Sequence, residues 1–203
     1  MSGSGIDESQ IPNDPYELFR QWWAQAQAES GMKEPSGMSL ATADAQGRPS
    51  NRIVLLKHWD RRGFVFYSNY TSRKARELHE NPHGALLFWW DKLRRQIRVC
   101  GQVEKVAERE SDAYFAGRPR GSQLGAWASQ QSRPLDSPDT LSKRVAQLDE
   151  EFGNDPIPRP PHWGGYRLIP REIEFWDDGA FRLHDRIVYL KDGEHWQIQR
   201  LYP

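Results

Sequence analysis

The chain has 203 residues, enough for one ample hydrophobic core, because a domain of this size buries about 70% of the surface of its unfolded chain. Lys plus Arg and Asp plus Glu both number 28, and this zero net charge disfavours nucleic acid, since a surface that binds a polyanion usually unbalances the sum. The single Cys100 excludes an internal disulfide and any cysteine-built metal site, which fits a reducing compartment.

The sequence contains neither a membrane span nor a secretory signal. The longest wholly apolar run, residues 85–90, is far too short to cross a bilayer. Residues 1–10 have neither the basic start nor the apolar stretch of a signal peptide. We therefore expect a cytoplasmic protein without a membrane partner.

The N-terminal part of the chain predicts a tail followed by a helix. Residues 1–12 are mostly Gly, Ser and other polar types, which predicts a flexible tail. Asp14 can cap a helix, and Glu17 completes an Asp-x-x-Glu capping pattern. Apolar residues then recur at helical spacing, so we expect a helix that ends at Gly31.

The next part of the chain has the alternating pattern of strands. Turn residues such as Gly47 and Gly63 separate the apolar stretches, as in an antiparallel meander. One short helix, capped by Thr71 or Ser72 and continuing to Glu80, interrupts them. Strands are predicted over residues 38–42, 50–57, 63–68, 84–90 and 96–106.

The C-terminal half mixes helices with closing strands. Helices are predicted over residues 108–116, 122–128 and 137–153, before a Pro-rich connector. Many short strands joined by hairpins, with a few inserted helices, predict a mainly β fold of the α+β class, an antiparallel barrel in a single domain over residues 13–203. The closing strands are predicted over residues 164–169, 172–176, 181–189 and 196–201.

Three residues near the C-terminus indicate a ligand-binding face. Arg182, His184 and Arg186 alternate with other residues, so an extended strand would place all three side chains on one side. Unpaired charges are almost never buried, so this row must lie in solvent, meet local carboxylates or meet an anionic ligand.

Two further clusters favour an anion. Arg52 and Lys57 bracket an apolar run that suits a strand buried on both faces, although two cations that reach solvent at strand ends would give the same pattern. Arg73 and Lys74 open a predicted helix, where free N–H groups and the helix dipole already favour phosphate. Cations at that end oppose the dipole unless an anion is bound.

The other polar groups carry little signal alone. Gln96 shares a strand face with other polar residues, as on any solvated face, and Gln131 with Ser132 could belong to any loop. His79 and His83 have ligand-like spacing, but the Asn-Pro between them breaks the helix, so we expect no metal site. Motifs of dinucleotide folds, nucleoside triphosphatases and serine hydrolases are absent.

Taken in order from about Asp14 to Pro203, short motifs make the chain similar to the pyridoxamine (pyridoxine) 5'-phosphate oxidase family of flavoproteins. Each motif is modest alone, but the ordered set is specific. The motifs are Arg52-Ile-Val-Leu-Leu-Lys57, Phe64-Val-Phe-Tyr67-Ser68-Asn69, Ser72-Arg73-Lys74, Arg118-Pro-Arg-Gly-Ser122, Gly125-Ala-Trp-Ala-Ser129, Arg159-Pro-Pro-His-Trp-Gly-Gly165, Glu174-Phe-Trp176 and Arg182-Leu-His184-Asp-Arg186.

This resemblance implies a split β-barrel that binds FMN as a homodimer, with each flavin at the subunit interface. Arg52, Arg73 and Lys74 would hold the FMN phosphate. Other contacts to the flavin would come from Ile53, Val54, Leu55, Leu56, Lys57, Tyr67, Ser68, Gln96, Gln131, Ser132, Trp176 and Arg186. The substrate phosphate would be held by Lys57, Tyr114, Arg118 and Ser122, and the catalytic Arg182 and His184 would lie over the pyridine ring.

The reaction implied is oxidation of pyridoxamine or pyridoxine 5'-phosphate to pyridoxal 5'-phosphate, with O2 as acceptor and H2O2 as product. Two alternatives stay open. One is an oxidase of the same fold that acts on a substrate without a phosphate, as phenazine-type enzymes do; the phosphate grip around Arg118 argues against it. The other is an FMN-binding protein without turnover, against which Arg182 and His184 argue.

Overall fold

The computed structural model describes residues 6–7, 9, 11–29 and 31–203. Residues 1–5, 8 and 10 of the predicted tail lie outside the described residues. Ile6 and Ile11 pack against the hydrophobic core, and the Tyr189 hydroxyl donates to the Pro12 carbonyl at 2.8 Å. These contacts hold part of the predicted tail against the C-terminal strands.

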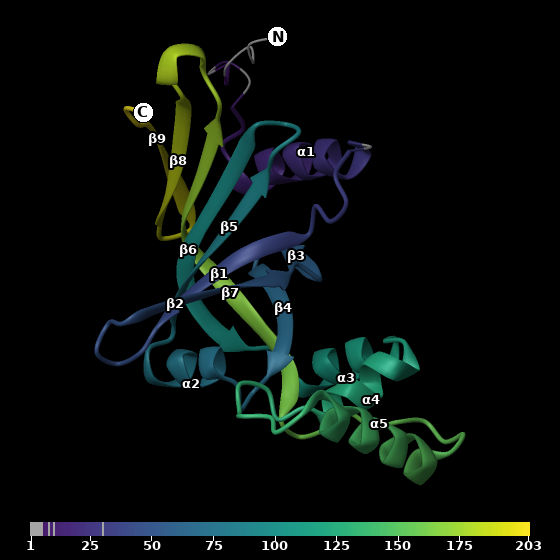
Figure 1. The fold of residues 1–203 in the computed structure, drawn as a ribbon. Coiled ribbons are helices and arrows are strands. Elements are labelled where there is room, and N and C mark those ends of the chain that lie inside the picture. The colour runs from purple at the N-terminus through teal and green to yellow at the C-terminus, as the bar shows by residue number, and fades with distance from the viewer. Residues whose placement is uncertain (1–5, 8, 10, 30) are drawn as a thin grey trace.

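One antiparallel sheet forms the body of the molecule, in the order β2-β1-β5-β6-β7-β4-β3, with β8 pairing with both β7 and β9. It curls as it crosses the molecule (Figure 1), which confirms the predicted α+β class and antiparallel barrel. In the part of the chain that the structure describes, the strands are β1 (Gly37–Ala43), β2 (Pro49–Leu55), β3 (His58–Asp60), β4 (Gly63–Asn69), β5 (His83–Trp90), β6 (Arg95–Lys105), β7 (Trp163–Asp177), β8 (Asp185–Asp192) and β9 (His195–Arg200).

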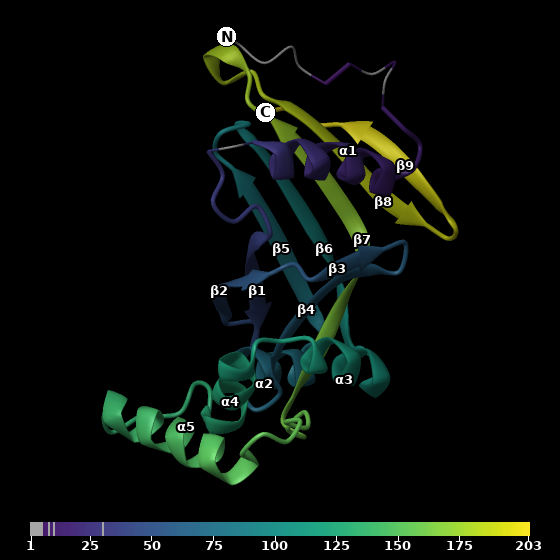
Figure 2. The ribbon, with the colours of Figure 1, turned by 90° about the vertical axis from the view of Figure 1, so that its right-hand side faces the viewer.

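Helices cover the two ends of this sheet. The first lies against the upper half, and the other four gather at the lower end (Figure 2). The predicted Asp14 cap is present, since its carboxylate accepts from the Tyr16 backbone N–H at 3.0 Å. The helices are α1 (Pro15–Ala28), α2 (Arg73–Glu80), α3 (Glu108–Ala116), α4 (Arg120–Ala128) and α5 (Pro138–Phe152).

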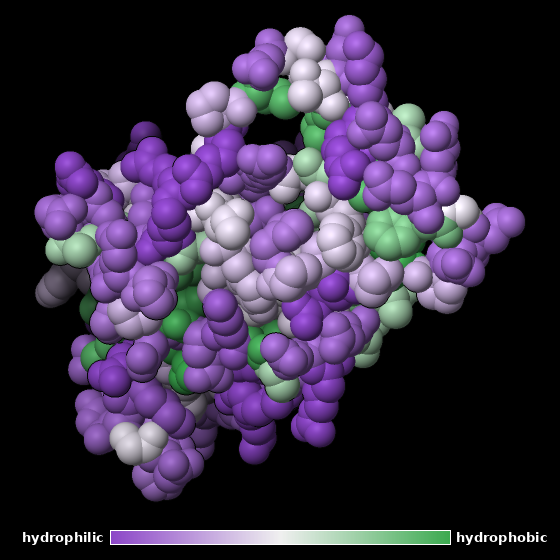
Figure 3. Space-filling view, turned by 90° about the horizontal axis from the view of Figure 1, so that it is seen from below, coloured by the Kyte–Doolittle hydropathy of each residue, from purple (hydrophilic) through white to green (hydrophobic). Residues whose placement is uncertain are grey.

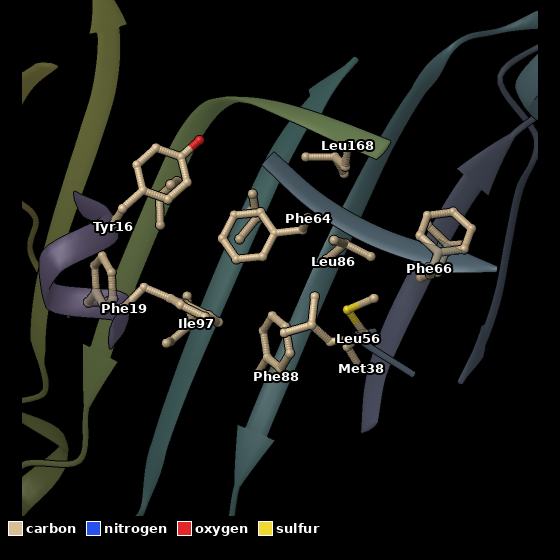
Figure 4. Packing of buried hydrophobic residues seen from close by; sticks show 14 of the residues in the cluster. Tyr16, Phe19, Met38, Leu56, Phe64, Phe66, Leu86, Phe88, Ile97 and Leu168 are labelled. Carbon is tan, nitrogen blue, oxygen red and sulfur yellow. The ribbon is translucent and has the colours of Figure 1, made fainter. Parts of the chain in front are cut away.

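Aromatic side chains from α1 and the sheet build the main core. Phe19 of α1 meets Phe64 of β4 edge to face, with ring centroids 4.9 Å apart, and Phe88 of β5 at 5.6 Å (Figure 4). A smaller core around Phe115 and Trp163 joins α3, α4 and α5 to the start of β7. The lower helices are therefore fixed to the sheet by their own apolar cluster.

Strand β7 corrects the prediction of separate strands over residues 164–169 and 172–176. It runs unbroken from Trp163 to Asp177, pairing with β4 in its first part and β8 in its last. Pro170, which cannot donate to a ladder, sits opposite Gly101 where the β6–β7 register shifts. This bulge lets the strand continue through the proline.

Strand β2 corrects a second prediction, that residues 52–57 form a strand buried on both faces. β2 pairs with β1 alone and is the end of the sheet. Its Ile53 side chain is 69% exposed, whereas Leu56, just beyond the strand, is buried. The apolar run is thus an edge strand with a free face, which suits contact with a ligand or a second subunit.

We predict that Gly101→Ala destabilises the fold. A Cβ at this position would overlap the carbonyl oxygen of Ile169 at the β6–β7 bulge, so the backbone must shift, at a cost of about 1–3 kcal/mol. Gly121→Ala is the matched control, because nothing lies within 4 Å of its Cβ position in helix α4 and alanine favours a helix. Urea unfolding should show a lower midpoint for the first variant alone; equal midpoints would contradict the close approach.

Candidate functional site

A cavity of about 690 Å³ opens at the lower end of the sheet, between β2, β4 and α4. Seen from below, this end is mainly hydrophilic, with apolar side chains showing in the gaps (Figure 3). We call it the α2 cavity, after Lys74 of helix α2 in its lining. Its lining includes these predicted site residues: Arg52, Ile53, Val54, Leu55, Lys57, Tyr67, Ser68, Lys74, Tyr114, Arg118, Ser122 and Gln131.

The structure adds lining residues to which sequence reasoning gave no role. These residues are Asn69, Gly125, Ala126, Ser129 and Trp163. Each stands within a motif of the family resemblance, so their positions were marked even though their chemistry was not. Small residues on α4 leave the space that a bound ring system needs.

A buried carboxylate organises the cationic side of the cavity. Glu77 of α2 accepts hydrogen bonds from Thr42 and Ser50, both at 2.5 Å, and from Arg73 Nε at 2.8 Å. Arg52 Nη2 lies 3.3 Å from the same carboxylate. Burial alone would raise the pKa of Glu77, but these hydrogen bonds and the Arg52 charge outweigh it and lower the pKa to about 2.

Lys74 carries a positive charge without a carboxylate of its own. Its Nζ donates to Gln131 Oε1 at 2.8 Å, to Ser68 Oγ at 3.0 Å and to Ser72 Oγ at 3.3 Å, all neutral acceptors. Burial, and then repulsion from Arg52, lower the pKa of Lys74 to about 8. An anion in the cavity would oppose both effects by stabilising the charged form, so this lysine is the clearest sign of an anionic ligand.

The start of helix α2 lies beside Lys74. Ser72 is the N-cap residue but its side chain makes no capping hydrogen bond. The Arg73 backbone N–H donates instead to Ser132 Oγ at 3.2 Å, and Ser132 has a left-handed φ of 71°. Arg73 and Ser132 therefore stand at the helix N-terminus next to the cavity rather than in its lining, and the helix dipole adds to the positive potential there.

Three stacked aromatic rings form another wall. Tyr67 lies 3.9 Å from Tyr114 and 5.4 Å from Trp163 by ring centroids, with interplanar angles of 7° and 10°. The Arg118 guanidinium lies over the Trp163 ring at 4.5 Å. Its Nη1 atom is buried without a hydrogen-bond partner among the described residues, and burial lowers the pKa of Arg118. A half-buried guanidinium with an unused donor favours an anionic partner.

The remaining predicted residues do not reach this cavity. Leu56 is in the core, while Gln96, Trp176 and Arg186 face one another across β6, β7 and β8 in the strand register. We call Gln96, Trp176, Arg182, His184 and Arg186 the hairpin group. The β7–β8 hairpin lies at the opposite end of the molecule from α2 and α4 (Figures 1 and 2).

The length of β7 sets the separation between the two groups. Trp163 of the cavity and Trp176 of the hairpin group lie on this one strand, so roughly 40 Å of extended chain separates them. One subunit therefore cannot bring the α2 cavity and the hairpin group onto one small ligand.

The predicted strand through Arg182, His184 and Arg186 is wrong. Strand β8 begins at Asp185, and residues 180–182 form a short 3₁₀ turn in which Phe181 and Arg182 have φ of 57° and 66°. Left-handed backbone breaks the alternation, so the three side chains share no strand face.

Arg186 has local partners. Its Nε donates to Glu174 Oε1 at 2.8 Å and its Nη1 to the Tyr202 carbonyl at 2.9 Å. Glu174 is buried and also pairs with Arg98. Arg98 also pairs with Glu172, so Arg186 is held in place by a network of two arginines and two carboxylates.

Comparison with known proteins identifies the group to which this architecture belongs. A family model described as pyridoxamine 5'-phosphate oxidase matches residues 24–151, and one described as the pyridoxine 5'-phosphate oxidase C-terminal dimerisation region matches residues 163–203. The chain belongs to the pyridoxamine 5'-phosphate oxidase family. The resemblance read from the motifs is thereby confirmed, and it makes the chain an oxidoreductase.

Relatives within the pyridoxamine 5'-phosphate oxidase family match along nearly the whole chain. The pyridoxine/pyridoxamine 5'-phosphate oxidase of Gluconobacter oxydans is 55% identical over 98% of this chain and 100% of its own. That of Rubrobacter xylanophilus is 52% identical over 98% of this chain and 92% of its own. A solved structure of PhzG from Burkholderia lata, in complex with tetrahydrophenazine-1-carboxylic acid, has a TM-score of 0.92 at 35% identity, with each chain fully covered.

The structure also bears on membrane association. Among the described residues, no helix is both long and apolar enough to span a bilayer.

We predict that inorganic phosphate stabilises the apoprotein in a pH-dependent way. Lys74 binds an anion best when protonated, so phosphate affinity should fall as pH rises through about 8. Melting curves with and without phosphate should show a larger stabilisation well below this pH than well above it. Lys74→Met should lose both the stabilisation and its pH dependence, and equal phosphate effects on both sides of pH 8 in the unaltered protein would contradict the assignment.

Proposed function

We propose that this protein is an FMN-dependent oxidase that converts pyridoxamine or pyridoxine 5'-phosphate to pyridoxal 5'-phosphate, with O2 as acceptor and H2O2 as product. The observation that carries the proposal is a family match over residues 24–151 and 163–203 that coincides with a cavity lined by four cationic side chains, Arg52, Lys57, Lys74 and Arg118. Relatives at 52–55% identity bear the name of this activity.

The α2 cavity fits the phosphate of FMN by its donor set. Arg52, Lys74 and the N-terminus of α2 offer charged and backbone donors, and the Lys74 Nζ donates only to neutral acceptors among the described residues. We assign the FMN phosphate to Arg52, Arg73 and Lys74. The exposed Ile53 and its neighbours on β2, with Ser68 and Gln131, then contact the rest of the flavin.

The substrate phosphate is assigned to the aromatic side of the same cavity. Arg118 has a buried Nη1 donor without a partner in the described chain, and Tyr114 and Ser122 lie in the same lining. Lys57 contributes a further cation at the end of the β2 segment. Two separate phosphate grips in one cavity would orient a phosphorylated ring beside a flavin, and this remote binding energy fixes the reacting carbon.

The hairpin group is assigned to the same site from the other subunit of a homodimer. The supporting observations are the distance along β7 within one chain and the match of residues 163–203 to a dimerisation region. In that arrangement Gln96, Trp176 and Arg186 complete the flavin site of the partner. Arg182 and His184 act on its substrate as the catalytic residues.

The residues of this chain bind and orient the reactants. When bound, FMN supplies the acceptor for the hydride from the 4' carbon and passes the electrons on to O2. Arg186 keeps a positive charge beside the ring system, which favours negative charge that develops there during the reaction. The stacked rings of Tyr67, Tyr114 and Trp163 exclude water from the phosphate end.

Action on a substrate without a phosphate is the weaker assignment. PhzG shares the fold but is 35% identical, against 52–55% for the phosphate oxidases. The buried Nη1 donor of Arg118, left without a partner, would also be costly in an enzyme that never binds a second phosphate.

We predict that anaerobic pyridoxamine or pyridoxine 5'-phosphate bleaches the visible absorbance of the FMN-loaded protein, and that air restores it. The control is the same substrate without its phosphate. It should bleach the flavin far more slowly, because Arg118 and its neighbours then have no phosphate to bind. A flavin that stays oxidised with both substrates would indicate an FMN-binding protein without turnover. Equal rates with both would instead favour the substrate class without a phosphate.

We predict that two inactive variants restore activity when mixed. Arg118→Ala damages the α2 cavity and Arg182→Ala the hairpin group, so each homodimer should be nearly inactive. In a co-expressed heterodimer, a site shared between subunits leaves one of the two sites with both groups intact, and about one quarter of full activity returns in an equal mixture. If each site lay within one chain, no activity would return, because every site in the heterodimer would carry either Arg118→Ala or Arg182→Ala.

A further inference from the structure

The β7–β8 hairpin encloses one edge of the His184 ring. His184 Nδ1 lies 3.0 Å from Asp178 Oδ1, and the Gly179 backbone N–H points at the same nitrogen from 3.2 Å. The ring packs against Trp176 with centroids 4.5 Å apart. No hydrogen bond reaches Nε2 from the residues that the structure describes. The Nε2 edge of the ring is therefore the one that can meet a bound molecule.

The backbone of the hairpin is shaped to make these contacts. A Cβ at Gly179 would overlap the Leu183 carbonyl oxygen, so only glycine permits the closure. Leu183 N–H donates to the Ala180 carbonyl at 3.0 Å, and Phe181 and Arg182 take left-handed φ values. Such backbone is costly for non-glycine residues and persists where the surroundings hold it in place.

The two contacts on Nδ1 require opposite protonation states. The Gly179 N–H needs a lone pair on Nδ1, whereas the Asp178 carboxylate needs a proton there. A charge-assisted hydrogen bond is about twice as strong as a neutral one, and an unprotonated Nδ1 would face the carboxylate with two lone pairs opposed. The carboxylate therefore decides in favour of a proton on Nδ1.

Arg94 holds that carboxylate in place. Its guanidinium pairs with Asp178 Oδ2, leaving Oδ1 for His184, and the Asp178 backbone N–H donates to the Arg94 carbonyl at 3.1 Å. Both His184 and Asp178 are largely buried, while Arg94 is mostly exposed. The orientation of Asp178 thus comes from the turn between β5 and β6, an element separate from the hairpin.

We propose that Asp178 is a positioning residue that keeps a proton on His184 Nδ1 and thereby presents Nε2 to the substrate. This rests on the proposed function, in which His184 of one subunit meets the substrate held by the other. Without Asp178 the Gly179 contact takes over, the proton moves to Nε2 and the ring offers a donor in place of an acceptor. Asp178 acts through His184 and touches neither substrate nor flavin.

The kinetic test compares Asp178→Ala with Asp178→Asn in the FMN-loaded dimer. Stopped-flow flavin reduction by pyridoxine 5'-phosphate should slow by about tenfold or more in both, because the loss of a hydrogen bond to a charged partner is worth about this factor. Substrate affinity should change much less, since the phosphate grip lies in the other subunit. Asn keeps the shape of Asp but can donate to Nδ1, so a purely structural role predicts that Asn behaves as the unaltered protein.

One variant and the unaltered protein serve as controls. Asp192→Asn removes an exposed carboxylate at the far end of β8 and should leave the reduction rate unchanged. If the unaltered protein is not reduced by substrate at all, the proposed function fails. If the unaltered protein is reduced and Asp178→Asn matches it, the role of Asp178 alone is overturned.

A second readout needs no turnover. Nitrogen-15 chemical shifts of the histidine rings report which nitrogen carries the proton, and His184→Phe identifies the signal by its absence. In the FMN-loaded protein without substrate, Nδ1 of His184 should be protonated, and in Asp178→Asn the proton should move to Nε2. An unprotonated Nδ1 in the unaltered protein would overturn the inference even if the Asp178 variants are slow or unstable.

Discussion

The pairing of β7 with three other strands separates the two groups of candidate site residues. It pairs with β6 along most of its length, with β4 near its start and with β8 near its end. The sheet therefore continues from β7 into β4 at one end and into β8 at the other. Trp163 of the aromatic wall of the α2 cavity lies at the beginning of β7, and Trp176 of the hairpin group lies near its end. A strand is stiff along its axis, so these two groups are kept apart within one chain.

Charge in this protein is separated in space although it sums to zero. Most arginines meet carboxylates, as Arg167 does with Asp60 and Glu110, and such pairs balance locally. Around the α2 cavity the buried acid Glu77 already accepts from several donors, while the Lys74 Nζ donates only to neutral acceptors among the described residues. A neutral sequence can therefore still hold a strongly positive cavity, because what matters to a small anion is the sum over a few ångströms.

Much of the fold could be predicted because local signals agree with tertiary structure. The Asp14 cap and the boundaries of α3 are where the sequence put them. The misses are tertiary in origin: Pro170 is tolerated in a strand because Gly101 faces it, and the edge position of β2 depends on strand order, which periodicity does not encode. Similarly, the left-handed residues 181–182 interrupt an alternation that reads as a strand. The residues lining the α2 cavity were found through motif order, while their convergence needed the folded chain.

The contacts of Ile6 and Pro12 with strand β8 tie together chain segments almost as far apart as the sequence allows. The Ile6 N–H bonds to Asp185 across 179 positions, and α1 places Trp22 against Phe175 of β7. During synthesis α1 is therefore made long before Phe175 of β7, with which its Trp22 packs. Native contacts of such high sequence separation slow folding and prolong the exposure of aromatic side chains, so this protein should depend on chaperones during synthesis more than a helical protein of its size.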